Sequence, residues 1–517
     1  MKSAIRARIF RMAVVLVAAN LAWRAVRYFL AMPIWGDEAF VADNLLSRGW
    51  SDMIRPLEYG QFVPLLFMWI ELGITKVLGF SECAVRLFPF LCGLASMLLL
   101  WQFAARTLDR RAALLAIGIF AASYYPVRHA AEVKPYAGDL LAALVLIHLA
   151  WSLYQRPGSA ARWLCLIVLT AAGIWFSYPS VFVSGAIGLF MLGLACRSRS
   201  KRLLAACCLY GAVLAASFAL MYLTYARPQR EAAVWITDIP TWKSAFPPLA
   251  QPWRLPLWLL DVHTGNMLAY PVGGKYGGST LTLLLVLVGS VAAWRRCRPV
   301  LWLLLGPLLL NFIAAAMQCY PYGSSARVAL YMAPAFCWLA GQGLRTALAS
   351  CLRPRAAVRG VQIAAGILLL IALGGMARDL THPYKSLADR NNRQTIRLLA
   401  DQAKPQDRWI VFQGLRPCDY APEIASYGGF GARFRFYVST LAPVPVSWAP
   451  PPDHLPANPP GTTWLIVYRG YYLSFPEQQV AEYVKALTAR LGEPDRQTYI
   501  LDDIERIEVY RFTGRAP

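Results

Sequence analysis

The sequence predicts an α-helical polytopic membrane protein of about eleven spanning helices, followed by a small α/β soluble domain at its C-terminal end. Three observations predict this class. Of the 517 residues, 57% are hydrophobic and 15% are charged, whereas a soluble domain carries roughly 25% charged residues. Apolar runs of about twenty residues, long enough to cross a hydrocarbon core of about 30 Å as helices, recur between residues 9 and 377. Beyond residue 378 the runs shorten, and 15 of the 28 acidic residues lie there.

The basic residues predict how the spans are oriented. Arginine and lysine gather in every second connection between apolar runs, which places much of the net charge of +23 on one side of the membrane. By the positive-inside rule the N-terminus is cytoplasmic and, after an odd number of spans, the C-terminal domain is periplasmic or extracellular. The membrane accounts for the charge, so we expect no nucleic-acid partner. Spans are expected at 9–30, 85–105, 112–125, 136–154, 163–176, 181–195, 203–225, 280–294, 300–317, 328–344 and 358–376.

Three outer segments, 33–80, 128–136 and 226–278, belong to the predicted membrane domain of residues 1–378. The first is amphipathic and predicts two short interfacial helices, one after Gly36 and one around 62–78. The second of these could instead be a span that contains Glu71, although the alternation of charge along the chain argues against it. The segment 226–278 is rich in proline and cannot be one continuous helix.

The C-terminal residues 379–517 predict an extracytoplasmic α/β domain. Short β-branched and aromatic runs indicate strands, and a proline followed by helical spacing of apolar residues indicates a helix. The proline-dense stretch 442–461 is expected to be a loop. The strands are expected at 409–412, 433–438, 464–468, 498–501 and 505–512, and the helix at 476–491.

Two adjacent carboxylates, Asp37 and Glu38, follow the first span and therefore lie at the outer membrane surface. One interpretation is structural, because acidic side chains are favoured in the first turn of a helix by its dipole. The other is functional, since a carboxylate at this surface could act as a general base where a lipid-borne substrate meets a water-side one. The residues alone leave both readings open.

The outer segment 128–136 places four ionisable side chains between two spans. His129 and Glu132 are three residues apart, so on a helical turn they share a face. A His-x-x-Glu pair is a weak metal signal, and binding of a divalent metal ion here stays open. Lys134 precedes the next span, and Asp139 lies one turn into it, where an acid is costly unless it is paired or faces a cavity.

Two arginines stand at the outer ends of spans, Arg86 before the second and Arg327 before the tenth. Single arginines at such places often extend their head groups to the membrane surface. Together with Lys134 and Lys275 they could instead gather a lipid phosphate, which arginine grips with two parallel hydrogen bonds.

The pattern resembles the bacterial family-39-like glycosyltransferases of the GT-C fold class, which are related to the protein mannosyltransferases and the lipid A aminoarabinose transferases. The resemblance covers the membrane part, and the C-terminal domain matches only in position. It rests on Trp35-Gly36-Asp37-Glu38, Leu46-Ser47-Arg48-Gly49-Trp50, Tyr59 to Trp69 with Pro64-Leu65-Leu66, Gly79-Phe80-Ser81-Glu82, Arg86-Leu87-Phe88-Pro89, Glu132-Val133-Lys134-Pro135-Tyr136, and Arg327 before Tyr331 and Pro334.

The resemblance implies a multi-pass enzyme of the bacterial cytoplasmic (inner) membrane that takes a sugar from a polyprenyl-phosphate-linked donor. The acceptor would be a lipid, a glycan or a protein. Asp37 would be the catalytic base, and Glu38 would be its partner in the catalytic pair. The sequence departs from the aminoarabinose transferases where a Glu-Lys-Pro-Pro stretch would stand, because it has Gln61-Phe62-Val63-Pro64. The donor phosphate would be held differently, and the residues expected to bind substrate or phosphate are Arg86, His129, Glu132, Lys134, Tyr136 and Arg327.

Two other classes of protein share some of these features. A lipid or solute transporter would also have many spans, but transporters usually mark a midplane site with broken helices in paired halves, and the sequence shows no such internal symmetry. A polysaccharide polymerase or ligase would share substrates and location, yet it gives no reason for the early acid pair.

Overall fold

The computed structural model describes residues 2–233, 240–274, 277–323, 325–412, 429–448, 461–469, 477–503 and 505–513. The chain forms two compact units. The first, here the membrane unit, comprises Met1–Leu30, Phe62–Ile74 and Arg86–Thr381. The second comprises Ala31–Gln61, Thr75–Val85 and His382–Pro517, so most of the first outer segment groups with the C-terminal residues.

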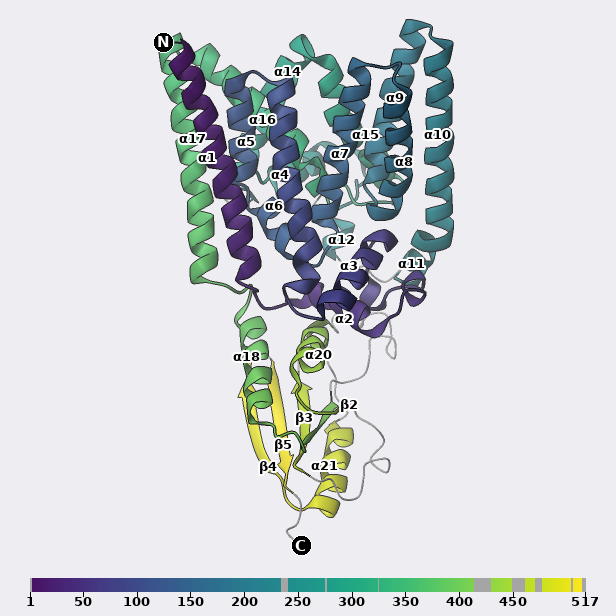
Figure 1. Ribbon diagram of the computed structural model, residues 1–517, viewed down its shortest axis with the longest axis vertical. Helices are drawn as coiled ribbons and strands as arrows, with labels where there is room; N and C mark the ends of the chain where they lie inside the picture. The colour runs from purple at the N-terminus through teal and green to yellow at the C-terminus, as the bar shows by residue number, and fades with distance from the viewer. Residues whose placement is uncertain are drawn as a thin grey trace. The chain divides into compact units, whose positions relative to one another are not determined.

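Long helices run side by side in the membrane unit (Figure 1), one for each expected span. In the described part of the chain, eight helices are long and apolar enough to cross a membrane. The helices at the expected spans are α1 (Lys2–Phe29), α4 (Leu87–Thr107), α5 (Arg110–Ala121), α7 (Tyr136–Gln155), α8 (Ala160–Phe176), α9 (Ser180–Ser198), α10 (Lys201–Met221), α14 (Gly278–Arg296), α15 (Arg298–Ala316), α16 (Ala333–Cys351) and α17 (Pro354–Thr381).

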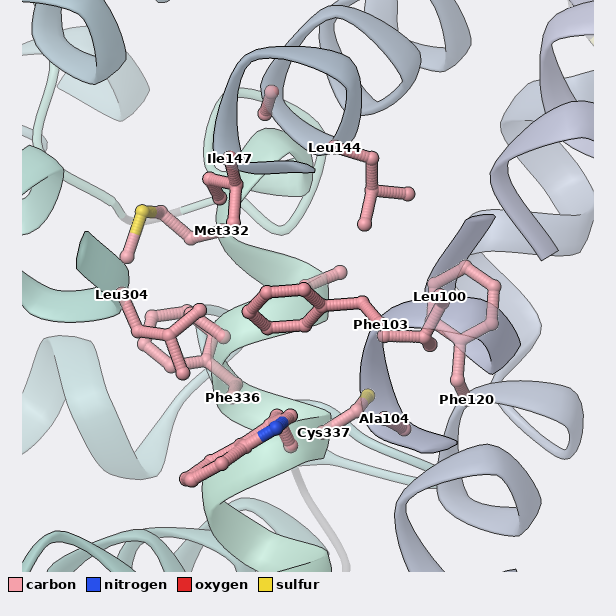
Figure 2. Packing of buried hydrophobic residues seen from close by; sticks show 14 of the residues in the cluster. Leu100, Phe103, Ala104, Phe120, Leu144, Ile147, Leu304, Met332, Phe336 and Cys337 are labelled. Atoms are coloured by element: carbon pink, nitrogen blue, oxygen red, sulfur yellow. The ribbon is translucent and has the colours of Figure 1, made fainter. Parts of the chain in front are cut away.

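The interior of the bundle is tightly packed, and its exterior is apolar. Figure 2 shows Phe103 of α4 surrounded by side chains from α7, α15 and α16. Between α14 and α16 the backbones approach so closely that a Cβ added at Gly289 would lie 1.9 Å from the carbonyl oxygen of Leu339, as small residues allow in membrane bundles. Outward-facing leucines such as Leu209 and Leu284 are more than half exposed. This distribution suits a lipid surrounding, and the chain is a multi-pass membrane protein.

Helix ends differ from the expected spans where local chemistry decides them. The tenth span was expected to begin at 328, but α16 begins at Ala333, next to Pro334, which is favoured in the first turn of a helix. At the other end of the unit, α17 continues to Thr381. Asp379 lies in this last turn and accepts hydrogen bonds from Arg27 (2.6 Å) and Trp23 (2.7 Å) of α1. These bonds fasten the end of α17 to α1 within the membrane unit.

The outer segments form short helices. The first contains α2 (Gly36–Ser47) and α3 (Leu65–Leu78), close to the two helices expected there. α3 has 14 residues, which fits the predicted short helix, and Glu71 within it is fully buried. The segment 226–278 is broken into α11 (Arg227–Ala232), α12 (Pro240–Lys243) and α13 (Leu255–Thr264), which confirms that it is not continuous. Lys275 lies outside the described residues.

The second unit contains a five-stranded sheet in the order β2-β1-β3-β5-β4. β1 runs parallel to β2 and β3, while β5 is antiparallel to β3 and β4. Apolar residues of α21 (Glu477–Leu491) pack on one face of the sheet and form its core. The small α/β domain is confirmed. Its strands are β1 (Arg408–Phe412), β2 (Val446–Trp448), β3 (Thr463–Arg469), β4 (Asp495–Ile500) and β5 (Arg506–Phe512).

The strand expected at 433–438 is wrong, because these residues lie in α20 (Gly429–Leu441). Arginine and aromatic residues alternate here, and such alternation is typical of a strand with one exposed and one buried face. In the structure both arginines are covered, since Arg433 pairs with Asp389 and Glu505, and Arg435 pairs with Asp43. The short β2 comes from the stretch expected to be a loop, of which residues 449–460 lie outside the described residues.

Candidate functional site

The acid pair lies in the first turn of α2, in the second unit. Trp35 is the N-cap in an extended conformation, and its carbonyl accepts from the backbone N–H groups of Glu38 (2.9 Å) and Ala39 (3.0 Å). Both carboxylates therefore occupy the end of the helix that favours negative charge. Glu38 is fully buried, whereas Asp37 is partly exposed. Of the two acids, Asp37 is the one that water or a substrate can reach.

Residues far along the chain hold α2 in place within this unit. Asp43, which is fully buried, accepts a hydrogen bond from the hydroxyl of Tyr59 (2.9 Å) and pairs with Arg435 of α20 (3.1 Å). Just before the helix, the backbone N–H of Ile34 donates to the hydroxyl of Tyr437 (2.7 Å), also on α20. The helix that carries the acid pair is thus fixed on both sides of Asp37.

The ends of the first outer segment are held in the same way. Arg393 of α18 (Leu387–Gln402) donates to the carbonyl of Ala31 and pairs with Glu82 at 3.1 Å. The ammonium group of Lys385 lies over the ring of Trp35, the residue that caps α2. The sequence did not predict these partners. A basic residue is expected to be exposed to water unless the group that it contacts is known, and these contacts join residues far apart in the chain.

A second cluster lies in the membrane unit, where α6 (Tyr124–Arg128) meets the short turn His129–Ala131. The two carboxylate oxygens of Glu132 accept from Arg128 Nε and from His129 Nδ1, each at 2.7 Å. The rings of Tyr125 and Tyr136 flank the imidazole, with centroids 6.2 and 5.1 Å away. The predicted residues His129, Glu132 and Tyr136 therefore lie together. Arg128 was missed, although its spacing of four from Glu132 is a recognised pairing distance.

The charged groups of this cluster shift the pKa values of Glu132 and His129. Burial alone would raise the pKa of Glu132, but His129 and Arg128 outweigh it and hold this pKa well below its usual range. Burial lowers the pKa of His129, and the charges of Arg128 and Arg327 add to that effect despite Glu132. The imidazole is therefore neutral and Glu132 ionised at pH 7. The charges of Arg128 and Arg327 both act on the imidazole.

The turn that carries the cluster is packed rigidly between α1 and α4. A Cβ added at Gly93 of α4 would lie 2.5 Å from the Cβ of Ala130 and 2.6 Å from Arg24 Nη1. Arg24 of α1 in turn donates to the carbonyl of Pro126 at 2.7 Å. Only glycine allows the turn to approach α4 so closely, so the position of His129 is set by two spanning helices.

The other predicted cations are buried at helix ends of the same unit. Arg86 is 2% exposed and is the N-cap of α4, and Lys134 is 5% exposed two residues before α7. The backbone N–H of Lys134 donates to the carbonyl of Glu132 at 2.8 Å, which joins it to the cluster. Arg327 lies in the turn before α16 and is partly exposed. Asp139 is buried in the first turn of α7.

Comparison with known proteins identifies the fold. Residues 63–223 match the model of the family described as dolichyl-phosphate-mannose-protein mannosyltransferase. The crystal structure of ArnT from Cupriavidus metallidurans bound to undecaprenyl phosphate is similar over 98% of this chain and 99% of that chain, with a TM-score of 0.54 and 14% identity. The chain has the GT-C glycosyltransferase fold. The apo structure of the same GT-C protein matches over 95% of this chain and 97% of that chain, with a TM-score of 0.52 and 12% identity. A search of curated protein sequences gave no match.

The family match covers some of the residues predicted to form the site. It includes Arg86, His129, Glu132, Lys134 and Tyr136, all in the membrane unit. The acid pair and Arg327 lie outside the matched residues.

The described residues of this GT-C chain contain no group of three or more His, Cys, Asp or Glu side chains that could hold a metal ion. At the predicted His-x-x-Glu pair, both carboxylate oxygens of Glu132 are engaged by Arg128 and His129. Neither oxygen of this carboxylate is left without a hydrogen-bond donor.

Replacing Glu132 by glutamine is expected to destabilise the protein by about 1.5–3 kcal/mol at pH 7, because it removes the charged acceptor of the hydrogen bonds from Arg128 and His129. The carboxyl pKa is depressed in the folded state, so the stabilisation is complete above the unfolded value of about 4.3 and is lost as the pH falls through the folded pKa. Thermal unfolding of wild type and variant in detergent between pH 7 and 3.5 should show a constant difference down to about pH 4.3 and the start of convergence below it.

An exposed pair with the same geometry provides the control. Arg227 Nε and Glu231 lie 2.7 Å apart at a spacing of four residues, but both side chains are more than half exposed. Glu231→Gln should change stability by less than about 1 kcal/mol at every pH. Equal effects of the two substitutions would show that burial of Glu132 contributes nothing.

Proposed function

We propose that the protein transfers a sugar from a polyprenyl-phosphate-linked donor to an acceptor hydroxyl at the outer face of the cytoplasmic membrane. The observation that carries this proposal is the GT-C fold, which extends over 98% of the chain in the comparison with undecaprenyl-phosphate-bound ArnT. The family matched by residues 63–223 is also described by a polyprenyl-type donor, dolichyl phosphate mannose. A donor of this kind is delivered within the membrane, which suits a multi-pass membrane protein.

The reaction needs a hydroxyl made nucleophilic and a leaving phosphate neutralised. Asp37 accepts the proton of the acceptor hydroxyl as the new glycosidic bond forms at the anomeric carbon. The bond from that carbon to the phosphate oxygen breaks, and polyprenyl phosphate departs with the electron pair. Arg327, with Lys134 or Arg86, stabilises the negative charge that develops there. The partial exposure of Asp37 and the electrostatic effect of Arg327 on His129 support these roles.

The remaining site residues orient the reacting groups. Glu132 accepts hydrogen bonds from Arg128 and His129 with its two oxygens, and the ring of Tyr136 packs against the imidazole. We assign these residues to binding and orientation of the donor phosphate. Glu38, buried beside Asp37 in the first turn of α2, is assigned to the acceptor side.

The distribution of basic residues supports the proposed orientation. The connections between α4 and α5, α9 and α10, and α14 and α15 carry clusters of arginine and lysine, and these connections lie at the end of the bundle where α1 begins (Figure 1). We therefore place the N-terminus in the cytoplasm and the C-terminal domain in the periplasm or outside the cell, in the inner membrane of a bacterium.

Labelled donors test the proposal directly. Purified full-length protein is incubated with a panel of radiolabelled polyprenyl-phosphate sugars and membrane extract as the source of acceptor. A transferase releases polyprenyl phosphate and moves the label to a new lipid, glycan or protein. A transporter reconstituted in vesicles would move the labelled lipid across the bilayer and leave the sugar–phosphate bond intact, and that result would refute the proposal.

A further inference from the structure

A crevice of about 430 Å³ lies between α1, α4 and α5, close to the beginning of α1. It is formed entirely within the membrane unit. Its lining residues are Arg6, Ala7, Ile9, Phe10, Ala13, Trp101, Ala105, Leu108, Arg110, Ala113, Leu114 and Ile117. The catalytic proposal gives this crevice no role.

The walls of the crevice are apolar. Leu114 and Ile117 of α5 are 1% exposed and form part of its floor. Phe10 of α1 and Trp101 of α4 face each other with ring centroids 6.3 Å apart, and Phe10 remains 60% exposed. An exposed aromatic ring beside an apolar floor, on the outer surface of a membrane bundle, suits contact with a hydrocarbon chain.

Two arginines complete the lining. Arg6 and Arg110 are exposed, and within the described residues neither side chain has a hydrogen bond or an ion pair. The nearest acid along the chain, Asp109, is engaged elsewhere: one oxygen accepts from the backbone of Arg111 and Ala112 at the start of α5, and the other pairs with Arg345 at 2.9 Å. The crevice therefore combines an apolar interior with unneutralised positive charge.

We propose that this crevice binds an anionic phospholipid, with its phosphate at Arg6 and Arg110 and an acyl chain along Phe10, Trp101 and Leu114. Basic pockets between spanning helices recognise anionic head groups, and arginine binds phosphate oxygens with paired hydrogen bonds. The apolar floor distinguishes a lipid from a free phosphate, which would have no use for it. The proposal does not depend on the chemistry proposed for Asp37.

Native mass spectrometry of the full-length protein measures the selectivity. Delipidated protein in detergent is titrated with phosphatidylglycerol and with phosphatidylethanolamine carrying the same acyl chains. Wild type should bind phosphatidylglycerol about tenfold more tightly or better, because each arginine near the head group favours the anionic lipid. The double variant Arg6→Gln/Arg110→Gln should bind the two lipids equally.

A matched control separates the crevice from the general positive charge of this end of the bundle. Arg197 and Arg202 are exposed at the connection of α9 and α10, outside the crevice, and Arg197→Gln/Arg202→Gln removes the same charge. This control should keep the selectivity of wild type. The variant Ala105→Trp, which fills the crevice at a lining residue that is already exposed, should weaken binding of both lipids.

Three results would overturn the proposal. Equal binding of the two lipids by wild type would remove the anionic selectivity. An equal loss in the Arg197/Arg202 control would assign the effect to overall charge. Unchanged binding in Ala105→Trp would show that the lipid adsorbs to the surface and does not enter the crevice.

Discussion

Asp37→Asn is expected to lower sugar transfer by at least about a hundredfold, since general base catalysis contributes about 10²–10⁴-fold. Asparagine keeps the size of the side chain and its place in the first turn of α2, but it cannot accept the proton of the acceptor hydroxyl. The measurement is the rate of label transfer at saturating donor, with KM for the donor expected to stay near that of wild type, because the donor phosphate is assigned to the cations of the membrane unit.

A second acid in the same outer segment is the control for this substitution. Asp52 lies at the surface and its side chain accepts from the backbone N–H of Gly49. Asp52→Asn makes the same chemical change and should leave transfer within about twofold of wild type. Turnover of Asp37→Asn at the wild-type rate would exclude Asp37 from the reaction and would leave only its role as a helix-terminal acid.

Replacing Arg433 by methionine is expected to destabilise the second unit by about 3–5 kcal/mol, because two buried acids would lose the cation between them. Arg433 is 3% exposed and pairs with both Asp389 and Glu505, and Glu505 also accepts from the hydroxyl of Tyr468 at 2.7 Å. Limited proteolysis of the purified protein should cleave the C-terminal residues much faster, and the melting temperature of that transition should fall.

The neutralised variant makes this prediction specific. Combining Arg433→Met with Asp389→Asn and Glu505→Gln removes the uncompensated charge and should recover much of the lost stability, since replacing a whole buried network is less costly than removing one member. Arg490→Met, an exposed position on α21, should behave as wild type. Wild-type resistance of the single Arg433 variant would show that the network contributes no stability.

The membrane fold was predictable from the sequence because its signal is local. A run of about twenty apolar residues can only be a helix in lipid, whatever the rest of the chain does. The C-terminal sheet was predictable for a similar reason, since the strands 409–412 and 464–468 are apolar, and 505–512 mixes charged with β-branched and aromatic residues. The segment 433–438 was not, because its arginines become buried only through Asp389, Glu505 and Asp43, which lie far away in the chain.

In the candidate site, too, local contacts were predictable from the sequence and contacts between distant residues were not. The contact of His129 with Glu132 follows from their spacing, and it lies within one short turn. The partners of α2 do not follow from any spacing, because Asp43 and Arg435 are 392 residues apart. Nothing near Arg435 in the sequence distinguishes it from an exposed basic residue, and only the folded chain shows which acid it meets.

The grouping of α2 with the C-terminal residues has a consequence for biosynthesis. The acid pair leaves the ribosome with the first span, whereas Arg393, Arg435 and Tyr437 are made only after the last one. Until then Asp43 lacks its contact with Arg435, and the N–H of Ile34 lacks its hydrogen bond to the hydroxyl of Tyr437. The segment proposed to carry the base therefore reaches its final packing late, and a nascent or prematurely terminated chain would insert into the membrane without acquiring a competent catalytic loop.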